Sequence, residues 1–284
     1  MSILEVDSVV VRFGGVVAVN NANYAVAEQQ ITGLIGPNGA GKTTSFNVIT
    51  GLQKPTEGRV RFQGKDITGL PVHRRARMGM GRTFQRLEAF GSLSVRENVQ
   101  VARDIHAGLR GIFRSGRSDV DGVLERVGII QYADERADNV PTGVARLLEL
   151  ARCLVGDPKL LLLDEPSSGL DESETDEFGE LLKDLAAEGR AILMVEHDMD
   201  LVMSVCDEIH VLDFGTIIAT GDPAEVRSNP KVQEAYLGAS VEDHDASGAG
   251  RHVAEDLTEQ TLVDIPAAEQ TTVVPAVNDQ GVRG

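Results

Sequence analysis

An apolar run beginning at Ile31 leads into a glycine-rich turn, G-P-N-G-A-G-K-T-T, that ends at Thr44. The three glycines of this turn let the backbone wrap a polyphosphate with its N–H groups pointing inward, and a helix starting near Gly41 would aim its positive end at the same place. Lys42 adds a point charge suited to β- and γ-phosphates, and the Thr43 hydroxyl is spaced to ligate Mg²⁺. The turn therefore predicts a phosphate-binding site formed by Gly36, Pro37, Asn38, Gly39, Ala40, Gly41, Lys42, Thr43 and Thr44.

A second candidate site follows a run of four leucines, Leu160–Leu163, which ends in Asp164 and Glu165. The run is typical of a buried parallel strand, and ligands bind at the carboxyl edge of such sheets. Asp164 can hold Mg²⁺ directly or through water, and Glu165 can polarise a water for attack on a γ-phosphate. Paired with the upstream phosphate loop, the two carboxylates predict a site that hydrolyses nucleoside triphosphates.

The elements expected to position these groups follow an α/β pattern. Residues 1–30 alternate apolar and polar positions in short runs, and a similar run spans Gly58–Phe62, which predicts a small, largely antiparallel sheet beside the phosphate-binding core. From Ser94 to Leu154 apolar residues recur at three- and four-residue steps, which predicts a helical insertion. A parallel α/β order then returns, with expected strands and helices at Leu160–Leu163, Glu172–Ala187, Ala191–Val195 and Met199–Val205.

Length and composition limit the classes of protein that fit. With 284 residues, 42% of them hydrophobic, the chain can bury a sizeable core. No apolar run reaches the roughly 18 residues needed to cross a bilayer, and the N-terminal residues are not basic, so neither a membrane span nor a secretory signal is expected. Cys153 and Cys206 lie in apolar segments without metal-ligand spacing, which favours structural thiols in a reduced, cytosolic setting.

The formal charge of −17 argues against nucleic acid as a partner. One local basic cluster lies around Gln85, and we interpret it as solvated surface, with a nucleic-acid site as the alternative. Its members are His73, Arg74, Arg75, Arg77, Arg82 and Arg86. After Gly238 the composition shifts to small, polar and acidic residues with little periodicity, which predicts an acidic, disordered tail at 239–284.

The order and spacing of these motifs resemble those of the ATP-binding subunits of ABC transporters over nearly all of residues 1–238. Gln85 in G-R-T-F-Q matches the family's glutamine loop, Ser167–Asp171 its dimer-contact loop, and His197 in E-H-D-M its switch histidine. The resemblance implies that Gln85 senses Mg²⁺ and the attacking water while touching a membrane partner. It also implies that His197 contacts the γ-phosphate and that Asp171 helps to join two nucleotide domains.

The resemblance implies an α/β fold: a P-loop NTPase core of the ABC ATPase type, with an antiparallel β flank and a helical subdomain at about 92–155. The implied cofactors are ATP and Mg²⁺. Phe13 in V-R-F-G-G matches the aromatic position that stacks on adenine, although a core aromatic is the other interpretation. The implied catalytic residues are Glu165, His197 and Gln85, and the implied metal-binding residues are Thr43, Gln85 and Asp164.

Within this family, four segments resemble the ATP-binding subunit of branched-chain amino acid importers: F-G-G-V-V-A-V, D-I-T-G-L-P-V-H-R-R-A-R-M-G-M-G-R-T-F-Q, V-E-H-D-M-D-L-V and E-A-Y-L-G. The resemblance implies a peripheral protein on the cytoplasmic face of the cell membrane. It would power uptake of branched-chain amino acids, or of a related amino acid, amide or urea, through separate polytopic permease subunits, with a substrate-binding protein acting indirectly. The permease would insert a short cytoplasmic helix beside Phe90 and Leu93.

The chain departs from the family at the signature loop, usually Leu-Ser-Gly-Gly-Gln, where it reads Val140-Pro141-Thr142-Gly143-Val144. Pro141 lacks the hydroxyl and N–H that the usual serine offers to the γ-phosphate of the opposite subunit, although proline suits the first turn of a helix. Gly143 could still supply an N–H, and Thr142 a hydroxyl. Each site of such a dimer combines one chain's phosphate loop with the other chain's signature. We therefore hypothesise a second ATP-binding subunit with an intact signature, a homodimer with a tolerated variant being the alternative.

Two other classes of protein share some of these motifs with a transporter subunit. A soluble ABC ATPase acting in translation or DNA repair would normally carry tandem nucleotide domains or a basic insertion, whereas this sequence has one phosphate loop and a net negative charge. A P-loop kinase would not explain the glutamine, dimer-contact and histidine motifs. The sequence therefore favours the ATP-hydrolysing subunit of an importer.

Overall fold

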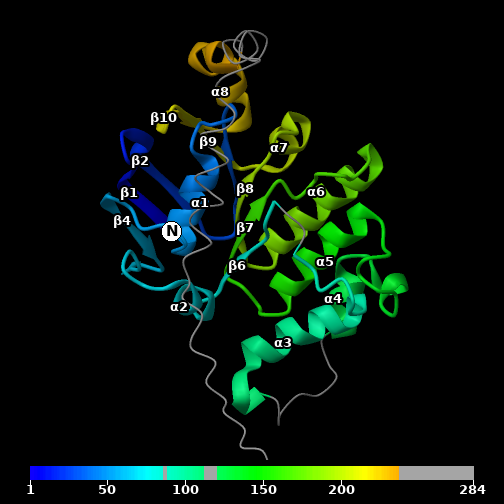
Figure 1. Ribbon diagram of the computed structural model, residues 1–284. Coiled ribbons are helices and arrows are strands. Elements are labelled where there is room, and N and C mark those ends of the chain that lie inside the picture. The colour runs from blue at the N-terminus through cyan, green and yellow to red at the C-terminus, as the bar shows by residue number, and fades with distance from the viewer. Residues whose placement is uncertain (86–87, 112–119, 237–284) are drawn as a thin grey trace, which may run out of the picture. The chain divides into compact units, whose positions relative to one another are not determined.

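The structure, a computed structural model, describes residues 1–85, 88–111 and 120–236, with side chains described outside 107–111. The first compact unit of the chain spans Met1–Ala239, and the predicted acidic tail at 239–284 lies outside the described residues. Figure 1 shows the elements of this unit. They are, in chain order, β1 (Ser2–Phe13), β2 (Val16–Ala27), β3 (Ile31–Ile35), α1 (Lys42–Thr50), β4 (Glu57–Phe62), β5 (Lys65–Asp66), α2 (Val72–Arg77), β6 (Met80–Arg82), α3 (Val95–Gly111), α4 (Val120–Arg126), the 3₁₀ helix η1 (Ile130–Tyr132), α5 (Thr142–Leu154), β7 (Leu160–Asp164), α6 (Glu172–Ala187), β8 (Ala191–Val195), α7 (Met199–Val205), β9 (Glu208–Asp213), β10 (Thr216–Gly221) and α8 (Pro223–Ser228).

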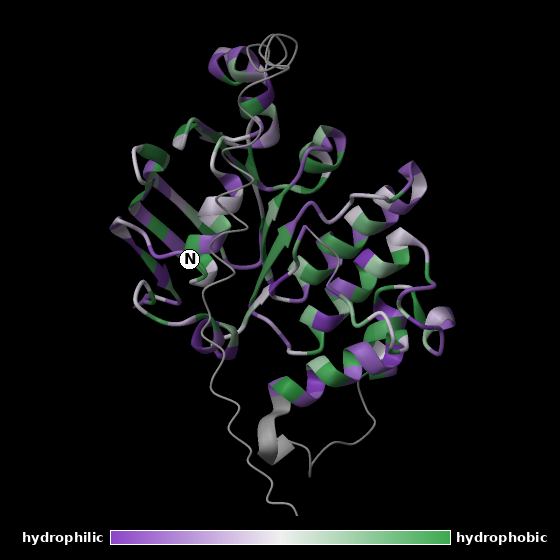
Figure 2. Cartoon of the chain, viewed as in Figure 1, coloured by the Kyte–Doolittle hydropathy of each residue, from purple (hydrophilic) through white to green (hydrophobic). Residues whose placement is uncertain are grey.

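A six-stranded sheet in the order β10-β9-β3-β8-β7-β6 forms the centre of this unit. Strands β9, β3, β8, β7 and β6 run parallel, and β10 is antiparallel to β9. Every residue of β3, β7 and β8 is buried. A strand covered on both faces has no solvent-facing positions, which explains the near-continuous aliphatic sequence of these strands. They form the green arrows at the centre of Figure 2.

Successive residues of the central strands face two different hydrophobic cores. Leu161 and Leu163 belong to a core shared with α3, α4, α5, α6 and α7, whereas Leu160 and Leu162 belong to a core shared with α1, β1, β2 and β4. Figure 1 shows the corresponding layers, with α5 and α6 on one side of the sheet and β1, β2 and β4 on the other. The four leucines of β7 therefore hold both layers against the sheet.

The second sheet has the order β2-β1-β4-β5 and is antiparallel, with β1 paired to both β2 and β4. Its inward side chains, such as Leu4 and Phe62, are fully buried. This sheet is the predicted antiparallel flank, and helices α3, α4 and α5 fill the stretch between β6 and β7. The predicted fold class, a P-loop α/β core with an antiparallel β flank and a helical subdomain, is confirmed.

The interpretation of the basic cluster as solvated surface is wrong for Arg75 and Arg82. The Arg75 side chain is buried and donates to the carbonyl oxygens of Val48 and Ile49 at 2.8 and 2.7 Å, and to that of Leu70 at 2.9 Å. The carbonyls at the end of α1 have no partner within the helix, and a guanidinium with several donors can satisfy more than one of them. Arg75 therefore fastens the end of α1 to the segment before α2.

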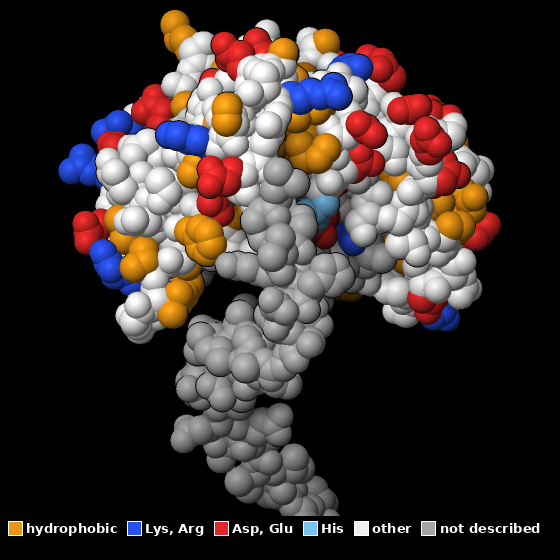
Figure 3. Space-filling model, turned by 90° about the horizontal axis from the view of Figure 1, so that it is seen from above, with side chains coloured by type: hydrophobic (Ala, Val, Ile, Leu, Met, Phe, Trp, Pro, Cys, Tyr) orange, Lys and Arg blue, Asp and Glu red, His pale blue; other side chains and the backbone are white. Residues whose placement is uncertain are grey.

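The exposed surface of the compact unit carries charges of both signs. On the face seen in Figure 3, basic side chains lie in small groups separated by acidic and uncharged ones. Among the residues that the structure describes, no helix is both long and apolar enough to cross a bilayer.

His210 of β9 connects the two sheets. Its Nε2 lies 3.0 Å from the carbonyl oxygen of Ala25 on β2, and its Nδ1 lies 2.9 Å from Oγ1 of Thr220 on β10. A carbonyl oxygen only accepts, which assigns the proton of the neutral ring to Nε2. Burial beside Tyr24 lowers the pKa of His210, and the bond to Ala25 and the Glu208 carboxylate, 3.7 Å away, oppose that shift. The ring is thus held neutral between the sheets.

The free energy of unfolding is expected to fall as the pH drops below the ordinary histidine pKa of 6.5, because the unfolded chain then binds a proton that buried His210 resists. Urea denaturation between about pH 8 and pH 5 measures this loss. His210→Gln, whose side-chain amide can still donate to Ala25, should lose less stability over the same interval. Identical pH profiles for the two proteins would show that His210 makes no such contribution.

Candidate active site

The phosphate loop joins β3 to α1, and two of its glycines, Gly36 and Gly41, occupy positions where a side chain does not fit. Gly36 has φ 151°, and a Cβ there would lie 1.9 Å from the carbonyl oxygen of Leu212. Gly41 precedes α1 with φ 104°, and a Cβ there would lie 2.4 Å from the carbonyl oxygen of Ala18. No side chain caps the start of α1. The first N–H groups of this helix are therefore left for an anion.

Lys42, the first residue of α1, is buried and turns back onto the loop. Its Nζ donates to the carbonyl oxygens of Gly36 at 2.6 Å and Pro37 at 2.9 Å. Burial lowers the pKa of Lys42, while the nearby carboxylates of Glu165 and Asp164 raise it. The ammonium group is thus held beside the loop, close to the carboxylates that end β7.

A cavity of about 260 Å³ opens over the loop. Most of the predicted site residues line it, and it brings together the ends of four neighbouring parallel strands, β3, β8, β7 and β6. This is the carboxyl edge at which such sheets bind ligands. The lining residues are Ala18, Asn38, Gly39, Ala40, Gly41, Lys42, Thr43, Thr44, Gln85, Glu165, Val195 and His197.

Glu165 is at the centre of the three residues predicted to be catalytic. Its Oε1 lies 2.8 Å from Nε2 of His197, and its Oε2 accepts from Nε2 of Gln85 at 3.1 Å. The residue has φ 50°, in the left-handed region that side chains other than glycine seldom adopt. The Glu165 carboxylate contacts a different partner with each of its two oxygens. The structure therefore brings together three residues that are more than 30 positions apart in the sequence.

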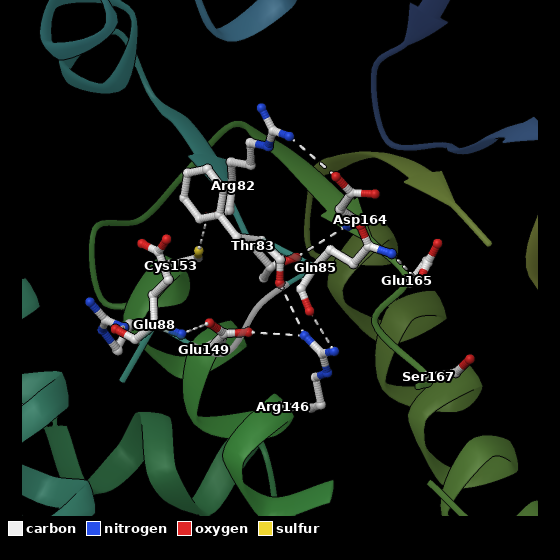
Figure 4. Close-up of polar contacts among 12 residues, drawn as sticks. Arg82, Thr83, Gln85, Glu88, Arg146, Glu149, Cys153, Asp164, Glu165 and Ser167 are labelled. Atoms are coloured by element: carbon white, nitrogen blue, oxygen red, sulfur yellow. Dashed lines mark hydrogen bonds and ion pairs between the residues drawn. The ribbon is translucent and has the colours of Figure 1, made fainter. Parts of the chain in front are cut away.

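Asp164 is buried at the end of β7 and forms an ion pair that the sequence did not predict. Its Oδ2 accepts from Nη2 of Arg82 at 3.2 Å, while Nη1 of Arg82 donates to Oδ1 of Asn47 on α1 at 2.7 Å. The guanidinium also lies over the rings of Phe46 and Phe84. Burial raises the pKa of Asp164 and lowers that of Arg82, and their mutual attraction opposes both shifts. Figure 4 shows the ion pair between Arg82 and Asp164. Arg82, taken for solvated surface, thus links the acidic strand to the helix of the phosphate loop.

Sequence reasoning also missed Thr83 and Glu196. The Thr83 hydroxyl accepts from the backbone N–H of Asp164 at 3.2 Å. The buried Glu196 carboxylate accepts from the N–H of Ser167 at 2.8 Å and from the N–H of His197 at 2.9 Å. Glu196 follows an entirely apolar strand, the same signal that pointed to Asp164, so its placement at the sheet edge could have been predicted.

Besides Gly36, Pro37 and Asp164, which are described above, three predicted residues lie outside the lining of this cavity. Phe13, at the end of β1, is 41% exposed, so its interpretation as a core aromatic is wrong. Gly143 is buried near the start of α5, where a Cβ would lie 2.9 Å from Cδ2 of Leu170. The Asp171 carboxylate caps α6 by accepting from the N–H of Glu174. Stacking of Phe13 and the contacts of Gly143 and Asp171 across a dimer remain predictions.

The donors at this edge fit a nucleoside triphosphate with Mg²⁺. The exposed Thr43 side chain and the nearby carboxylates offer hard oxygen ligands. No group of three or more His, Cys, Asp or Glu residues suited to a metal occurs in the part of the chain that the structure describes. Mg²⁺ differs from metals held in all-protein cages, because it usually takes one or two protein ligands together with phosphates and waters.

The fold and the site define a P-loop nucleotide-binding ATPase, and comparisons with known proteins identify its family. The family described as ABC transporter matches residues 19–168, and that described as Branched-chain amino acid ATP-binding cassette transporter matches 216–242. The high-affinity branched-chain amino acid transport ATP-binding protein LivG of Escherichia coli (strain K12) is 44% identical over 249 residues, which cover 83% of this chain and 98% of the relative. The lipopolysaccharide export system ATP-binding protein LptB of Haemophilus influenzae is 34% identical over 238 residues, covering 84% of this chain and 98% of the relative.

A solved structure, the ATP-binding cassette MJ1267 of an ABC transporter, superposes with a TM-score of 0.76 at 32% identity, covering 83% of this chain and 99% of that chain. The chain belongs to the ABC transporter family as one of its ATP-binding, ATP-hydrolysing subunits.

Proposed function

We propose that this subunit powers the uptake of branched-chain amino acids, or of a related amino acid, amide or urea, through separate permease subunits at the cytoplasmic face of the membrane. The observation that carries the proposal is the match of residues 216–242 to the branched-chain amino acid cassette family, joined to a complete phosphate loop and acidic strand. Identity to a named branched-chain relative is 44%, against 34% to a lipopolysaccharide exporter, which favours the amino acid class.

In the proposed site, Gly36–Thr44 holds the β- and γ-phosphates of ATP through its backbone N–H groups and the Lys42 ammonium. Thr43, Gln85 and Asp164 would hold Mg²⁺, which when bound would neutralise charge on those phosphates. Phe13 stacks on the adenine ring, a contact supported by its exposed position at the end of β1.

Hydrolysis is assigned to Glu165, His197 and Gln85. The Glu165 carboxylate accepts a proton from the attacking water, and the bonds from Gln85 and His197 fix the direction in which it points. His197 would also contact the γ-phosphate, the role that the family resemblance implies. Glu196 would position His197 through its backbone N–H. Each side chain in this scheme acts from the end of a parallel strand or from the loop that follows it.

A groove of about 330 Å³ lies between the β6–α2 region and the helices α3 and α5. Four exposed hydrophobic side chains line it: Leu52, Val72, Phe90 and Ile105. We assign this groove to the short cytoplasmic helix of a permease subunit. The family resemblance implies a helix beside Phe90 and Leu93; Phe90 lines the groove, whereas Leu93 is not among its lining residues. Exposed apolar surface of this kind is typical of protein interaction sites.

A second ATP-binding subunit with an intact signature is proposed as the partner of this chain. Pro141 caps α5 in an extended conformation without a side-chain hydrogen bond, so it offers neither the hydroxyl nor the N–H of the usual serine. The site containing Lys42 and Glu165 would be completed by the partner and hydrolyse ATP. The opposite site, completed by Pro141–Gly143 of this chain, would hydrolyse poorly.

The purified chain alone is expected to hydrolyse ATP at least about tenfold more slowly than the assembled transporter, because each of its homodimeric sites would lack a phosphate donor. Restoring the serine and the glutamine of the motif with Pro141→Ser and Val144→Gln should raise the rate of the isolated chain. Steady-state ATPase assays on the two purified proteins and on the assembled transporter give the comparison. A full rate from the unaltered homodimer would count against the asymmetric pair.

The proposed function is tested by capture and by transport. Tagged Glu165→Gln protein with Mg-ATP should recover polytopic membrane subunits and a second ATP-binding chain from solubilised membranes. Deletion of the gene should reduce uptake of labelled leucine, isoleucine or valine, and the wild-type chain but not Lys42→Ala should restore it. Recovery of ribosomes or DNA-repair proteins without membrane subunits would instead favour a soluble ABC ATPase.

A further inference from the structure

One face of α5 bonds to backbone atoms of the glutamine loop at Phe84, Gln85 and Glu88. Nη1 of Arg146 donates to the carbonyl oxygen of Phe84 at 3.0 Å, and its Nη2 donates to that of Gln85 at 2.7 Å. One turn further along, Oε1 of Glu149 accepts from the N–H of Glu88 at 2.7 Å. After another turn, Nη1 of Arg152 donates to the carbonyl oxygen of Glu88 at 2.7 Å. We call these three side chains the α5 clasp.

The clasp is more constrained than a surface ion pair. The side chains of Arg146 and Glu149 are 10% and 5% exposed and lie 3.4 Å apart. Arg146 spreads its two terminal nitrogens over two successive carbonyl groups, which fixes the orientation of the peptide groups and not only their distance. The Arg152 guanidinium also lies over the Phe90 ring, 5.3 Å from its centroid. Because these side chains bond to backbone atoms, the contacts depend on the position of the loop and not on the identity of its side chains.

On its other side, the same loop bonds to the end of β7 and to Glu165, which follows that strand. Thr83 bonds to Asp164 through its hydroxyl, and the Gln85 amide donates to the Glu165 carboxylate. Figure 4 shows the loop between the β7 carboxylates and Arg146 and Glu149 of α5. A displacement of the Gln85 backbone therefore has to move α5 or break the charge-assisted bonds from Arg146.

Helix α5 also contacts the dimer-contact loop at its first turn. A Cβ on Gly169 would lie 2.9 Å from Cγ2 of Thr142, and a Cβ on Gly143 would lie 2.9 Å from Cδ2 of Leu170. At its other end, Arg152 and Glu149 line the apolar groove assigned to a permease helix. The helix is thus a single rigid connection between the groove, the glutamine loop and the segment that replaces the signature.

We propose that Arg146, Glu149 and Arg152 are positioning residues that transmit movement of the glutamine loop to the first turn of α5. Binding of nucleotide, or of a permease helix in the groove, then changes the conformation of Thr142–Gly143. The part of this inference that concerns the permease groove rests on the proposed function. The part that concerns nucleotide binding applies to the isolated chain and does not depend on which substrate is transported.

The first test measures hydrogen exchange of backbone amides in the full-length chain with and without Mg-ATP. In the wild-type protein, nucleotide should change exchange both in the phosphate loop and at residues 142–145. In Arg146→Met, the phosphate loop should respond as before, while the response at 142–145 falls by about fivefold or more, the size of a typical coupling between sites. Arg146→Lys keeps the charge but cannot span both carbonyls, so its response should be intermediate; it also serves if the Met variant does not fold.

A matched control is Arg126→Met, since Arg126 is a partly exposed arginine on α4 that pairs with Asp184 of α6 and with Glu188 just after it, rather than with the loop. It should leave the response at 142–145 unchanged. A response in Arg146→Met equal to that of the wild type, or an equal loss in Arg126→Met, would overturn the proposal. If Arg146→Met also lost ATP affinity to the same extent, the clasp would only stabilise the folded structure, and the proposal would be overturned as well.

The second test uses the assembled transporter. Arg146→Met should lower kcat for ATP about tenfold with KM for ATP within about twofold and with normal co-purification of the partners, because the clasp acts after nucleotide binding. Arg146→Met and Arg152→Met together should cost little more than either alone, since both act on one loop. Additive losses, or an unchanged kcat, would overturn the proposal. Failure of the proposed function would appear in the wild type as absence of membrane partners, whereas failure of this inference appears only in the variants.

Discussion

ATP turnover is expected to fall by about 100-fold or more in Glu165→Gln, with ATP binding retained. The variant keeps the shape of the side chain but has no carboxylate to accept a proton from the attacking water. Its amide also places an N–H₂ group against either His197 or Gln85, which contact the two oxygens of Glu165 at 2.8 and 3.1 Å. Lys42 and the phosphate loop are unaltered, so ATP affinity should stay close to that of the wild type. Single-turnover hydrolysis and equilibrium nucleotide binding separate the two quantities.

Glu172→Gln is the matched control for this variant, because Glu172 is an exposed acid at the start of α6 and touches neither His197 nor Gln85. It should hydrolyse ATP at the wild-type rate. With binding preserved and hydrolysis stopped, Glu165→Gln should also accumulate closed, nucleotide-bound dimers that elute earlier in size-exclusion chromatography. Wild-type turnover in Glu165→Gln would remove this residue from its assigned role.

The central strands and the helices that follow them could be predicted closely from the sequence. The predicted limits of α6, β8 and α7 coincide with the structure, and β7 is one residue longer than predicted. Such elements are marked by local signals: continuous aliphatic runs for strands buried on both faces, and Asp171 and Asp198 as caps at the starts of the two helices. Local signals are enough to predict the limits of an element where the sequence pattern changes clearly between that element and the next.

The gathering of the site residues followed from topology once the motifs were known. The strands that precede the four motifs are neighbours in the order β3-β8-β7-β6, although their order along the chain is different. Parallel strands deliver their carboxyl ends to one edge, so motifs that follow them meet there whatever the order. The positions of Lys42, Glu165 and His197 around one cavity are the consequence.

The buried arginines could not be predicted, because no local pattern distinguishes them from solvated ones. Arginine is rarely buried, so a run such as H-R-R-A-R reads as surface. Arg75 and Arg82 are buried because carbonyls of α1 and the Asp164 carboxylate, remote in the sequence, are brought to them by the fold. The α5 clasp escaped prediction for the same reason, since it recognises backbone atoms that carry no sequence signal.

Arg82→Met is expected to lower the free energy of unfolding by about 3–5 kcal/mol, the range observed when one partner of a buried ion pair is removed. The side chains of Arg82 and Asp164 are only 8% and 2% exposed, so the remaining carboxylate cannot recover water as a partner. The Arg82 guanidinium also bonds to Asn47 and Thr50 of α1, and those oxygens would lose their donor. Urea denaturation at neutral pH measures the difference from the wild type.

Two further variants distinguish an unpaired charge from lost packing. If the uncompensated Asp164 carboxylate is the cause, Arg82→Met combined with Asp164→Asn should regain a large part of the lost stability, because the double variant has no buried charge left without a partner. Arg61→Met is the control for removing a paired arginine: its partner Glu5 is 3.5 Å away and both side chains are more than a third exposed, so the cost should stay below about 1 kcal/mol. An Arg82→Met protein no less stable than Arg61→Met would mean that Asp164 does not depend on the ion pair. If the losses in free energy of unfolding of the two single variants simply add in the double variant, the loss in Arg82→Met would instead come from the broken contacts with α1.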